Sequence, residues 1–295
     1  MIPLAIGTAQ FGQAYGVCNK DGPVEGGIAQ DIVDLAMQSG VYFFDTARLY
    51  GDSELVLGAV LPSGDAPFII TKISAEPDHP DKLLKDCEDS LRRLNRESVH
   101  AVLIHNVQSL LGAGGRGIWD ALEALRERNL TDKIGVSVYT PEEFIIVADR
   151  FTPDIVQVPC NLLDQRFLRA DVQKVKKEKK IEFYARSLFL QGILINLPET
   201  LPDFMKDNHA CFADIEKAVM AQKATGMEIC LSFARDFAQK ELVDRWVVGV
   251  DSPAQLKEIL QAANGDKELS IKNWECFKTE SLDIIDPRNW KRGSA

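Results

Sequence analysis

The sequence predicts a (β/α)8 TIM barrel that spans residues 1–295 as a single domain, with an inserted loop after the seventh strand and a C-terminal tail. Short runs of β-branched and aromatic residues recur along the chain. Most are continuously apolar, as expected of strands buried on both faces of a parallel sheet. Amphipathic segments with helical period separate these runs. No linker rich in Pro, Gly or Ser interrupts the alternation, which argues against two domains.

Eight runs are expected to form the strands of the barrel. In chain order they are residues 4–8, 41–46, 68–72, 100–105, 133–138, 154–159, 181–186 and 245–250. Between them, helical periodicity is clearest in residues 29–40, where apolar residues recur on one face and Gly40 marks the C-terminal end. Residues 79–95 and 117–129 repeat their apolar positions at the same period.

Two regions depart from the regular alternation. The interval from Arg186 to Trp246 is longer than the others, and residues 192–212 within it are expected to form an inserted loop followed by an extra helix. Beyond Leu260 the chain continues, and we expect one more helix and a strap across the surface. We expect both additions to lie outside the barrel and to leave the order of its strands unchanged.

Composition and charge narrow the class of protein. Hydrophobic residues make up 45% and charged residues 26%, as in globular proteins of enzyme size. The net charge of −10 disfavours nucleic acid and anionic membranes as partners. The N-terminus lacks a basic region followed by a long apolar segment, and the six scattered cysteines form no C-x-x-C pair. We therefore expect a cytoplasmic protein with reduced thiols and no metal site; the sequence does not indicate the oligomeric state.

A glycine-rich segment resembles a dinucleotide fingerprint. Residues Gly112–Gly117 fit the pattern G-x-G-x-x-G, and a helix is expected to follow at Ile118. That fingerprint requires the glycines immediately after a strand, inside a βαβ unit. Here the preceding strand ends near His105 and several residues intervene, so we predict a loop.

Polar residues end several of the expected strands. Asp45, Lys72 and His105 terminate the second, third and fourth strands, and Tyr50 lies on the loop after Asp45. Taken singly, they would be a turn cap, a lysine reaching solvent, a core histidine and surface packing. In a (β/α)8 barrel, however, the C-terminal strand ends converge on one face. We therefore expect the four side chains to meet there.

These four groups suit the reduction of a carbonyl. A phenol has an ordinary pKa near 10 and becomes a proton donor near neutral pH when a cation stabilises the phenolate. Lys72 is expected to supply that cation, held charged and oriented by Asp45. His105, as a neutral donor, would hold the carbonyl oxygen beside Tyr50. No side chain donates hydride, so the chemistry requires a nicotinamide cofactor.

Several motifs together resemble the aldo-keto reductase superfamily. They are GTAQFG, FDTARLYGDSE, ITK, LIH and GVS, and the likeness extends through QVPCNLLDQR and VVGVDSPAQLKEIL. The resemblance runs from Leu4 to Leu260, and it implies the barrel fold with a catalytic tetrad. Carried over onto this chain, the tetrad is Asp45, Tyr50, Lys72 and His105.

The same resemblance implies a site for NADP(H) or NAD(H) and a small carbonyl substrate. Ser137 and Gln157 would hold the nicotinamide carboxamide, with Asn161 near the site. Tyr50, His105 and Asn106 would contact the substrate. The full set of implied cofactor-binding residues is Thr8, Asp45, Ser137, Gln157, Arg186, Ser187, Gly249 and Gln255.

Three departures from the family pattern bear on the cofactor. Val138 stands where Asn usually follows the serine, and Arg186 stands where an aromatic ring often stacks on the nicotinamide. The guanidinium of Arg186 would stack on a ring, bind an anion or form a structural salt bridge. Many NADPH-preferring relatives carry basic residues and an Asn in the last loop. This chain has neutral residues at those positions, with only Lys257 nearby, while Asp251 would favour a free ribose hydroxyl; the positions are Gly249, Val250, Gln255 and Ile259.

The function expected from these residues is an NAD(P)H-dependent reductase of an aldehyde, ketone or sugar-like carbonyl. An alternative is a cofactor-binding regulatory subunit that senses redox state with little turnover. A third is a Schiff-base lyase that uses Lys72. The substrate pocket is expected to be shaped by three loops: residues 10–15, 106–117 and 188–212.

Overall fold

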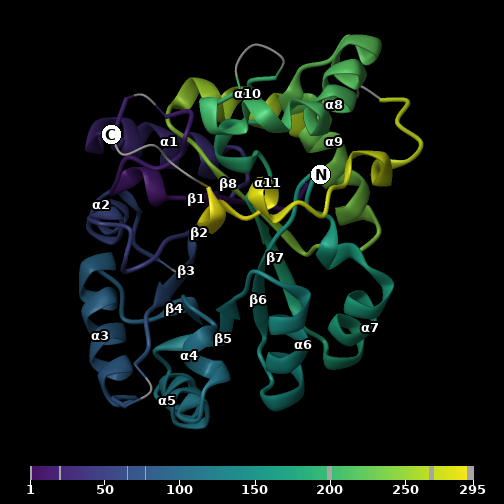
Figure 1. Cartoon of the computed structure of the whole chain (residues 1–295). Coiled ribbons are helices and arrows are strands. Elements are labelled where there is room, and N and C mark those ends of the chain that lie inside the picture. Colours follow the sequence, from purple (N-terminus) through teal and green to yellow (C-terminus); the bar gives the residue numbers. More distant parts are fainter. Residues whose placement is uncertain are drawn as a thin grey trace.

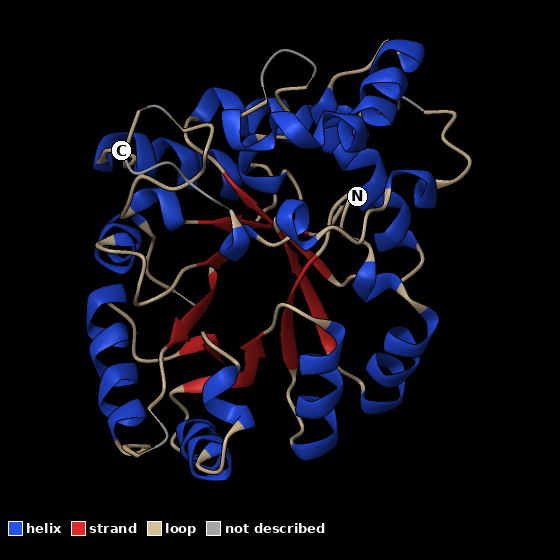
Figure 2. Cartoon of the chain, in the orientation of Figure 1, coloured by secondary structure: helices blue, strands red, loops and turns tan. Residues whose placement is uncertain are grey.

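The computed structural model describes residues 2–19, 21–64, 66–76, 78–197, 201–265 and 269–290, without the side chain of Asp207. Eight parallel strands pair in sequence order, and β8 pairs with β1 to close the barrel (Figures 1 and 2). The predicted fold is confirmed. The strands are β1 (Leu4–Gly7), β2 (Phe43–Asp45), β3 (Phe68–Ile73), β4 (Val99–Ile104), β5 (Thr131–Ser137), β6 (Ile155–Pro159), β7 (Glu182–Arg186) and β8 (Arg245–Gly249).

Helices surround the strands and cover the outside of the barrel (Figure 2). The strongly amphipathic segments form helices because their apolar side chains repeat on the face that packs against the sheet. Apart from the insertion after β7 and the C-terminal tail, which are described below, the α-helices are α1 (Gly26–Gln38), α2 (Ser53–Val60), α3 (Lys82–Leu94), α4 (Gln108–Leu111), α5 (Gly115–Glu127), α6 (Pro141–Arg150), α7 (Ala170–Lys179) and α10 (Pro253–Asn264). None of the described helices is long and apolar enough to cross a bilayer.

The expected insertion after β7 contains two helices, α8 (His209–Gln222) and α9 (Gly226–Gln239), grouped with α10 in Figure 1. The chain then returns to β8. Thr225 begins α9 with a capping box, because its side chain accepts from the backbone N–H of Glu228 while the Glu228 side chain accepts from Thr225. Part of the predicted loop, residues 198–200, lies outside the described residues.

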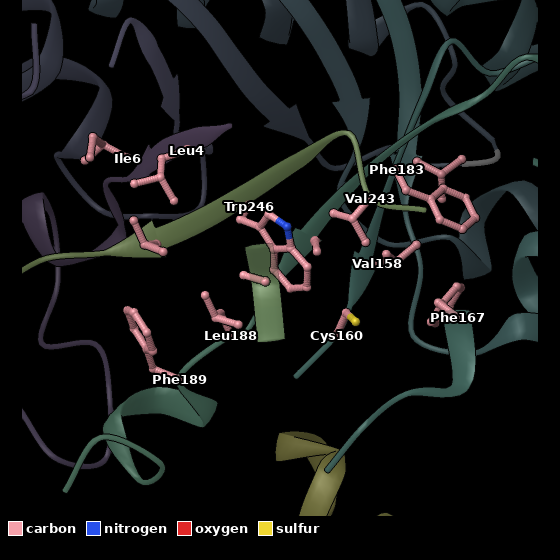
Figure 3. Close-up of a cluster of buried hydrophobic side chains, with 14 of the residues drawn as sticks. Leu4, Ile6, Val158, Cys160, Phe167, Phe183, Leu188, Phe189, Val243 and Trp246 are labelled. Carbon is pink, nitrogen blue, oxygen red and sulfur yellow. The ribbon is translucent and has the colours of Figure 1, made fainter. Parts of the chain in front are cut away.

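The hydrophobic core has two compartments. Figure 3 shows part of the larger one, where Trp246 of β8 packs among side chains from neighbouring strands and the loop after β7. The smaller compartment fills the inside of the barrel, and its buried members are Ala5, Ile70, Ala101, Leu103, Ile155, Tyr184 and Val247. Apolar side chains on both faces explain why the strands are continuously apolar in sequence.

The C-terminal tail passes along the loops that follow β5 and β6 (Figure 1, yellow). Gln165 Nε2 donates to the carbonyl of Trp274 at 2.7 Å, and Thr279 N donates to the carbonyl of Leu163 at 2.9 Å. The tail contains the short helix α11 (Leu282–Ile285), and the Arg288 guanidinium lies 3.8 Å from the Tyr139 ring centroid. The expected strap therefore lies against the carboxyl-terminal side of the barrel.

Residues 112–114 of the glycine-rich segment lie between α4 and α5, whereas residues 115–117 form the first turn of α5, so the predicted loop is wrong for that half. Gly115 is the first residue of α5, where a Cβ would lie 1.9 Å from the carbonyl oxygen of Leu110. This glycine permits close backbone packing. As predicted, the segment is not the strand-to-helix turn of a dinucleotide fingerprint.

Candidate active site

Alternation along the strands directs the predicted site residues into the mouth of the barrel. Side chains two positions apart share one face of a strand. Phe43 packs against the interior cluster, and Ile70, Leu103, Ile155, Tyr184 and Val247 belong to it. Ser137 pairs with Gln157 on the neighbouring strand and shares its face. The residues two positions beyond those interior side chains are Asp45, Lys72, His105, Gln157, Arg186 and Gly249.

Lys72 and Asp45 form a buried ion pair at this face. Lys72 Nζ lies 2.6 Å from Asp45 Oδ2 and donates to the carbonyl of Thr46 at 2.9 Å. Gln157 Nε2 donates to the other carboxylate oxygen at 2.7 Å. Burial lowers the pKa of Lys72, and the carboxylate of Asp45 opposes that shift. The residues from β2, β3 and β6 therefore form one hydrogen-bonded network.

The loop that carries Tyr50 is fixed by the rest of its motif. Ser53 Oγ donates to the carbonyl of Thr8 at 2.6 Å and lies within hydrogen-bond distance of the hydroxyls of Thr8 and Thr46. Glu54 is buried, and Thr71 Oγ1 donates to it at 2.7 Å. The serine and glutamate that follow Tyr50 in the sequence thus anchor the loop to β1 and β3.

Gly12 and the Tyr50 loop are in direct backbone contact. A Cβ at Gly12 would lie 1.8 Å from the carbonyl oxygen of Tyr50, and Gly51 has a φ of +57°, with Gly12 O 2.2 Å from its own hypothetical Cβ. Both positions require glycine. At Gly12 there is no space for a side chain, and at Gly51 the backbone is also left-handed.

Gly12→Ala is therefore expected to displace Tyr50 and to lower the free energy of unfolding by about 1–3 kcal/mol. Urea denaturation measures the stability, and steady-state kinetics should show a fall in kcat. Gly27→Ala in α1 is the matched control, because nothing lies within 4 Å of its added methyl group. Equal behaviour of the two variants would contradict the role given to Gly12.

Tyr50 and His105 meet edge to face above the ion pair. Their ring centroids are 5.6 Å apart at an interplanar angle of 88°, and Lys72 Nζ lies 5.0 Å from the Tyr50 ring centroid. Burial and the nearby Asp45 carboxylate raise the pKa of Tyr50, while Arg186 opposes the shift. The phenol is therefore protonated at neutral pH. The expected tuning of this phenol by Lys72 stays a prediction; the cation that opposes the rise in the pKa of Tyr50 is Arg186.

His105 is neutral at physiological pH. Burial, together with the positive charges of Lys72 and Arg186, lowers the pKa of His105 to about 3. Its Nδ1 is buried without a hydrogen-bond partner among the described residues. A neutral imidazole donates one hydrogen bond, which is the property that the predicted carbonyl-orienting role requires.

The lowered pKa of His105 makes stability depend on pH. Below about pH 6.5 the unfolded imidazole binds a proton that the folded one does not, so stability is lost as the pH falls from there toward 3. We expect this group to cost about 2 kcal/mol between pH 7 and pH 5. In urea denaturation, His105→Gln should lose about 2 kcal/mol less over that interval than the wild type.

His209→Gln serves as the control for this measurement. The His209 side chain is 62% exposed, on α8. Its substitution should alter the pH dependence of stability by less than His105→Gln does, because an exposed ion pair at 3.7 Å to Glu216 contributes little. An unchanged slope in His105→Gln would show that His105 is not the responsible group.

Arg186 is held by a ring and a carbonyl rather than by a carboxylate. Its guanidinium lies 4.2 Å from the Tyr139 ring centroid, and Nη2 donates to the carbonyl of Val138 at 3.1 Å. Among the described residues, no carboxylate lies within ion-pair distance of it. The structural salt bridge considered for Arg186 is thus absent from the described part of the chain, and the cation borders the cavity.

A cavity of about 400 Å³ opens beside Tyr50 and Asp45. Two of the three loops expected to shape it do so, through residues that include Gln10 and Tyr15 after β1 and Leu188 to Asn196 after β7. The expectation for residues 106–117 is wrong for the described lining of this cavity. Val107 and Leu110 are buried, and Gln108 Nε2 donates to Glu143, so this loop packs against its neighbouring helices instead.

The predicted cofactor residues divide into two groups. Some border the cavity directly: Asp45, Gln157, Arg186, Ser187, Gly249 and Gln255. Thr8 and Ser137 are buried outside the described lining, where the Thr8 hydroxyl bonds with Ser53 and the carbonyl of Asp45. Asn161 donates to the carbonyl of Ser187 at 3.1 Å and supports that wall from behind.

The predicted substrate residues also differ in position. Asn106 is exposed, and its side chain accepts from the N–H of Gln108 at 3.1 Å, so it caps the turn after β4. Tyr50 borders the cavity. His105 lies behind Tyr50, in contact with its ring.

Sequence reasoning missed several residues of the cavity wall, among them Asn19 and Glu258. Helical spacing offers a signal for Glu258, because it follows Gln255 by three residues on α10 and therefore shares its face. Asn19 gave no such signal. It lies beyond the expected loop, and it reaches the cavity because its side chain bonds back to the carbonyls of Tyr15 and Gly22.

The donor set fits a nicotinamide dinucleotide. Gln157 presents an amide at the Tyr50 end, Arg186 offers a planar cation for a ring or a phosphate, and amide side chains border the far end. The unpartnered ring nitrogen of His105 is consistent with a site that a further group completes.

Known proteins are similar to this chain in sequence and in fold. Over 98% of its length, the chain is 24% identical to L-galactose dehydrogenase of Arabidopsis thaliana and covers 93% of that protein. Over 58% of its length, it is 32% identical to an aldo-keto reductase of Mycolicibacterium vanbaalenii and covers 61% of it. It spans about half, 52%, of the NAD(P)H-dependent 6'-deoxychalcone synthase of Glycine max, at 27% identity over 50% of this chain.

Solved structures give the same architecture. An aldo-keto reductase from Bacillus halodurans, in its holo form, superposes with a TM-score of 0.72 at 18% identity, over 90% of this chain and 88% of that one. Glycerol dehydrogenase from Gluconobacter oxydans gives 0.69 at 22% identity, over 90% and 87%. At these identities the likeness supports the fold. The sequence profile of the Aldo/keto reductase family, in contrast, matches residues 3–279, and this chain therefore belongs to that family.

Proposed function

We propose that the protein is an NAD(P)H-dependent oxidoreductase that reduces an aldehyde, ketone or sugar-like carbonyl to the alcohol. The observation that carries this proposal is the contact between the protonated phenol of Tyr50 and the neutral imidazole of His105, beside the buried Lys72–Asp45 pair. A phenol and an imidazole in this arrangement offer two hydrogen-bond donors to one carbonyl oxygen.

The proposed mechanism moves one proton through Tyr50. The bound dinucleotide supplies the hydride. Tyr50 Oη donates its proton to the carbonyl oxygen as negative charge develops there, while His105 holds that oxygen by a hydrogen bond. Lys72 and Arg186 place positive charge near the phenolate that remains, and Asp45 keeps Lys72 charged and oriented.

In the proposed binding mode, Gln157 and Ser137 hold the carboxamide. Arg186, Ser187, Gly249 and Gln255 border the space for the rest of the dinucleotide. Substrate contacts come from Tyr50, which borders the cavity, and from His105, whose ring contacts that of Tyr50.

Polar side chains around the cavity favour a hydroxylated, sugar-like carbonyl substrate. Gln10, Asn19, Gln191 and Asn196 all line it. The names of two relatives, L-galactose dehydrogenase and glycerol dehydrogenase, refer to polyhydroxylated compounds.

A turnover assay tests the proposal. The purified chain is incubated with NADH or NADPH and a panel of aldehydes, ketones and reducing sugars, and the oxidation of the cofactor is followed by absorbance. We expect turnover with at least one carbonyl. Tight dinucleotide binding with no turnover across the panel would instead favour the redox-sensing regulatory subunit.

The Schiff-base alternative has little structural support. Lys72 is 1% exposed, and its ammonium group is engaged by Asp45 and the carbonyl of Thr46. An amine must be neutral and accessible to attack a carbonyl.

A further inference from the structure

The ring of Tyr139, just after β5, contacts two guanidinium groups. That of Arg186 lies 4.2 Å from the ring centroid, and that of Arg288 lies 3.8 Å from it. Arg186 ends β7 and borders the cavity, whereas Arg288 belongs to the C-terminal tail and is about half exposed. The electron-rich face of a phenol ring attracts cations at these distances. One side chain therefore connects the tail with the cation that borders the cavity.

The main chain of Tyr139 is fixed by its neighbours. Its N–H donates to Glu143 Oε2 at 2.7 Å, and its carbonyl accepts from Arg166 Nη2 at 3.2 Å. The preceding carbonyl, of Val138, accepts from Arg186 Nη2 at 3.1 Å. Residues 138 and 139 thus hold Arg186 by a hydrogen bond as well as by the ring.

Two carboxylates near these arginines already have partners. Asp164 is buried and within electrostatic reach of Arg186, yet it accepts from Arg166 Nε and Nη2 at 2.8 and 2.7 Å. Asp286 accepts from Arg288 Nε at 2.9 Å and from its Nη2 at 2.6 Å. Because Asp286 neutralises it, Arg288 packs on the ring without adding net charge beside Arg186.

Buried side chains anchor the part of the tail that carries Arg288. Trp290 is buried, its Nε1 donates to the carbonyl of Ile284 at 3.1 Å, and its ring centroid lies 5.4 Å from that of Phe204. Asp286 is also buried. A fixed backbone and a fixed carboxylate therefore present the Arg288 guanidinium to the Tyr139 ring.

We infer that Tyr139 and Arg288 are positioning residues that hold the Arg186 cation beside Tyr50, so that the C-terminal tail takes part in the proton transfer. The part of this inference that concerns proton transfer rests on the proposed function. Arg186 and Tyr50 both border the cavity, and the positive charge of Arg186 opposes the rise in the pKa of Tyr50. A long arginine side chain that loses its contacts regains rotamer freedom, and the phenolate then loses part of its stabilisation.

Chemical modification of the arginines tests the positioning without any turnover. The full chain is treated with phenylglyoxal, and the modification rate of each arginine is measured by mass spectrometry of its peptides. Tyr139→Leu and Arg288→Gln should each raise the rate at Arg186 by at least about threefold, because a held guanidinium reacts when it is released. Arg235, held by carbonyl groups at the end of α10, is the internal reference, and its rate should not change.

A double-mutant cycle tests the catalytic role. We expect Arg186→Gln to lower kcat by about tenfold, and Tyr139→Leu and Arg288→Gln to lower it by at least about threefold each. In the Arg186→Gln background, the latter two substitutions should change kcat by less than about twofold, because they act through Arg186. Tyr139→Phe keeps the ring and should retain kcat within about twofold of the wild-type value.

Arg169→Gln is the matched control. Arg169 pairs with Asp171 two residues away, as Arg288 pairs with Asp286, and the two arginine side chains are similarly exposed. This substitution should change neither kcat nor the modification rate at Arg186.

The outcomes separate the inference from the proposed function. If the wild-type chain turns over no carbonyl, the proposed function fails and the role in proton transfer falls with it, while the modification rates still decide the positioning. An unchanged rate at Arg186 in both variants overturns the inference, and so does a kcat that is unchanged or that falls equally in the Arg186→Gln background. Should Tyr139→Leu fold poorly by circular dichroism, Arg288→Gln, at a half-exposed residue, decides by the same criteria.

Discussion

Tyr50→Phe is expected to lower kcat by about 10²–10⁴-fold, the range for loss of a positioned proton donor. The substitution removes only the hydroxyl, so the ring keeps its edge-to-face contact with His105 at 5.6 Å between centroids. Dinucleotide affinity should therefore stay within about twofold of the wild-type value, because the substitution removes an interaction made in the transition state and not one made with the bound dinucleotide. Single-turnover kinetics and a separate binding titration distinguish the two effects.

Tyr15→Phe is the matched control for this experiment. Tyr15 is a second phenol in the same cavity, on the loop after β1, and it has no role in the proposed proton transfer. Its loss should change kcat by less than about tenfold. If the two variants turn over equally with every active substrate, Tyr50 is not the proton donor.

Lys72→Met is expected to lower the free energy of unfolding by about 3–5 kcal/mol. Lys72 and Asp45 are 1% and 4% exposed, and the substitution leaves a buried carboxylate without its cation. The double variant Asp45→Asn, Lys72→Met removes both charges and should regain most of the stability, because a buried pair contributes little net energy. Urea denaturation of the three proteins measures both quantities.

Turnover measurements on the same variants distinguish a loss of stability from a loss of catalysis. The double variant should remain inactive although it is folded, since neither Asp45 nor Lys72 is left to support Tyr50. Lys82→Met is the control for stability, because the Lys82–Glu76 pair is about half exposed on each side chain. It should cost far less stability than Lys72→Met, because an exposed ion pair contributes little. A similar cost in Lys72→Met would contradict the buried-pair interpretation.

The convergence of Asp45, Tyr50, Lys72 and His105 was predictable from the sequence because strand ends carry positional information. In a closed parallel barrel all eight strands finish on the same face, so Asp45, Lys72 and His105 had to converge wherever their loops went. The position of Tyr50 beside them was predictable because it lies a short distance after Asp45 along the chain. The rest of its motif became clear only in three dimensions, where Ser53 bonds to Thr8 and Glu54 to Thr71.

The cavity wall was less predictable, because loop positions depend on contacts between distant residues. Residues 106–117 follow the strand that leads to His105, yet the bond from Gln108 to Glu143 and the burial of Leu110 direct them toward α5 and α6. The position of Arg186 depends on Tyr139, whose ring also contacts Arg288 of the C-terminal tail. These contacts join residues that are far apart in the sequence, so no local sequence pattern predicts them.

The sequence by itself therefore determined three things. The hydrophobic period determined the barrel, the motifs that resemble a known family determined the family, and the residue types at the strand ends determined their chemical character. Tertiary structure alone decided which groups surround each functional side chain. It made Lys72 and Asp45 a buried pair, brought Arg186 within electrostatic reach of Tyr50, and placed Asp251 beside amide side chains from the segment after β1 and from α10. The physical reason is that burial and electrostatic environment are set by residues far apart in the chain, and they become defined only when the barrel closes.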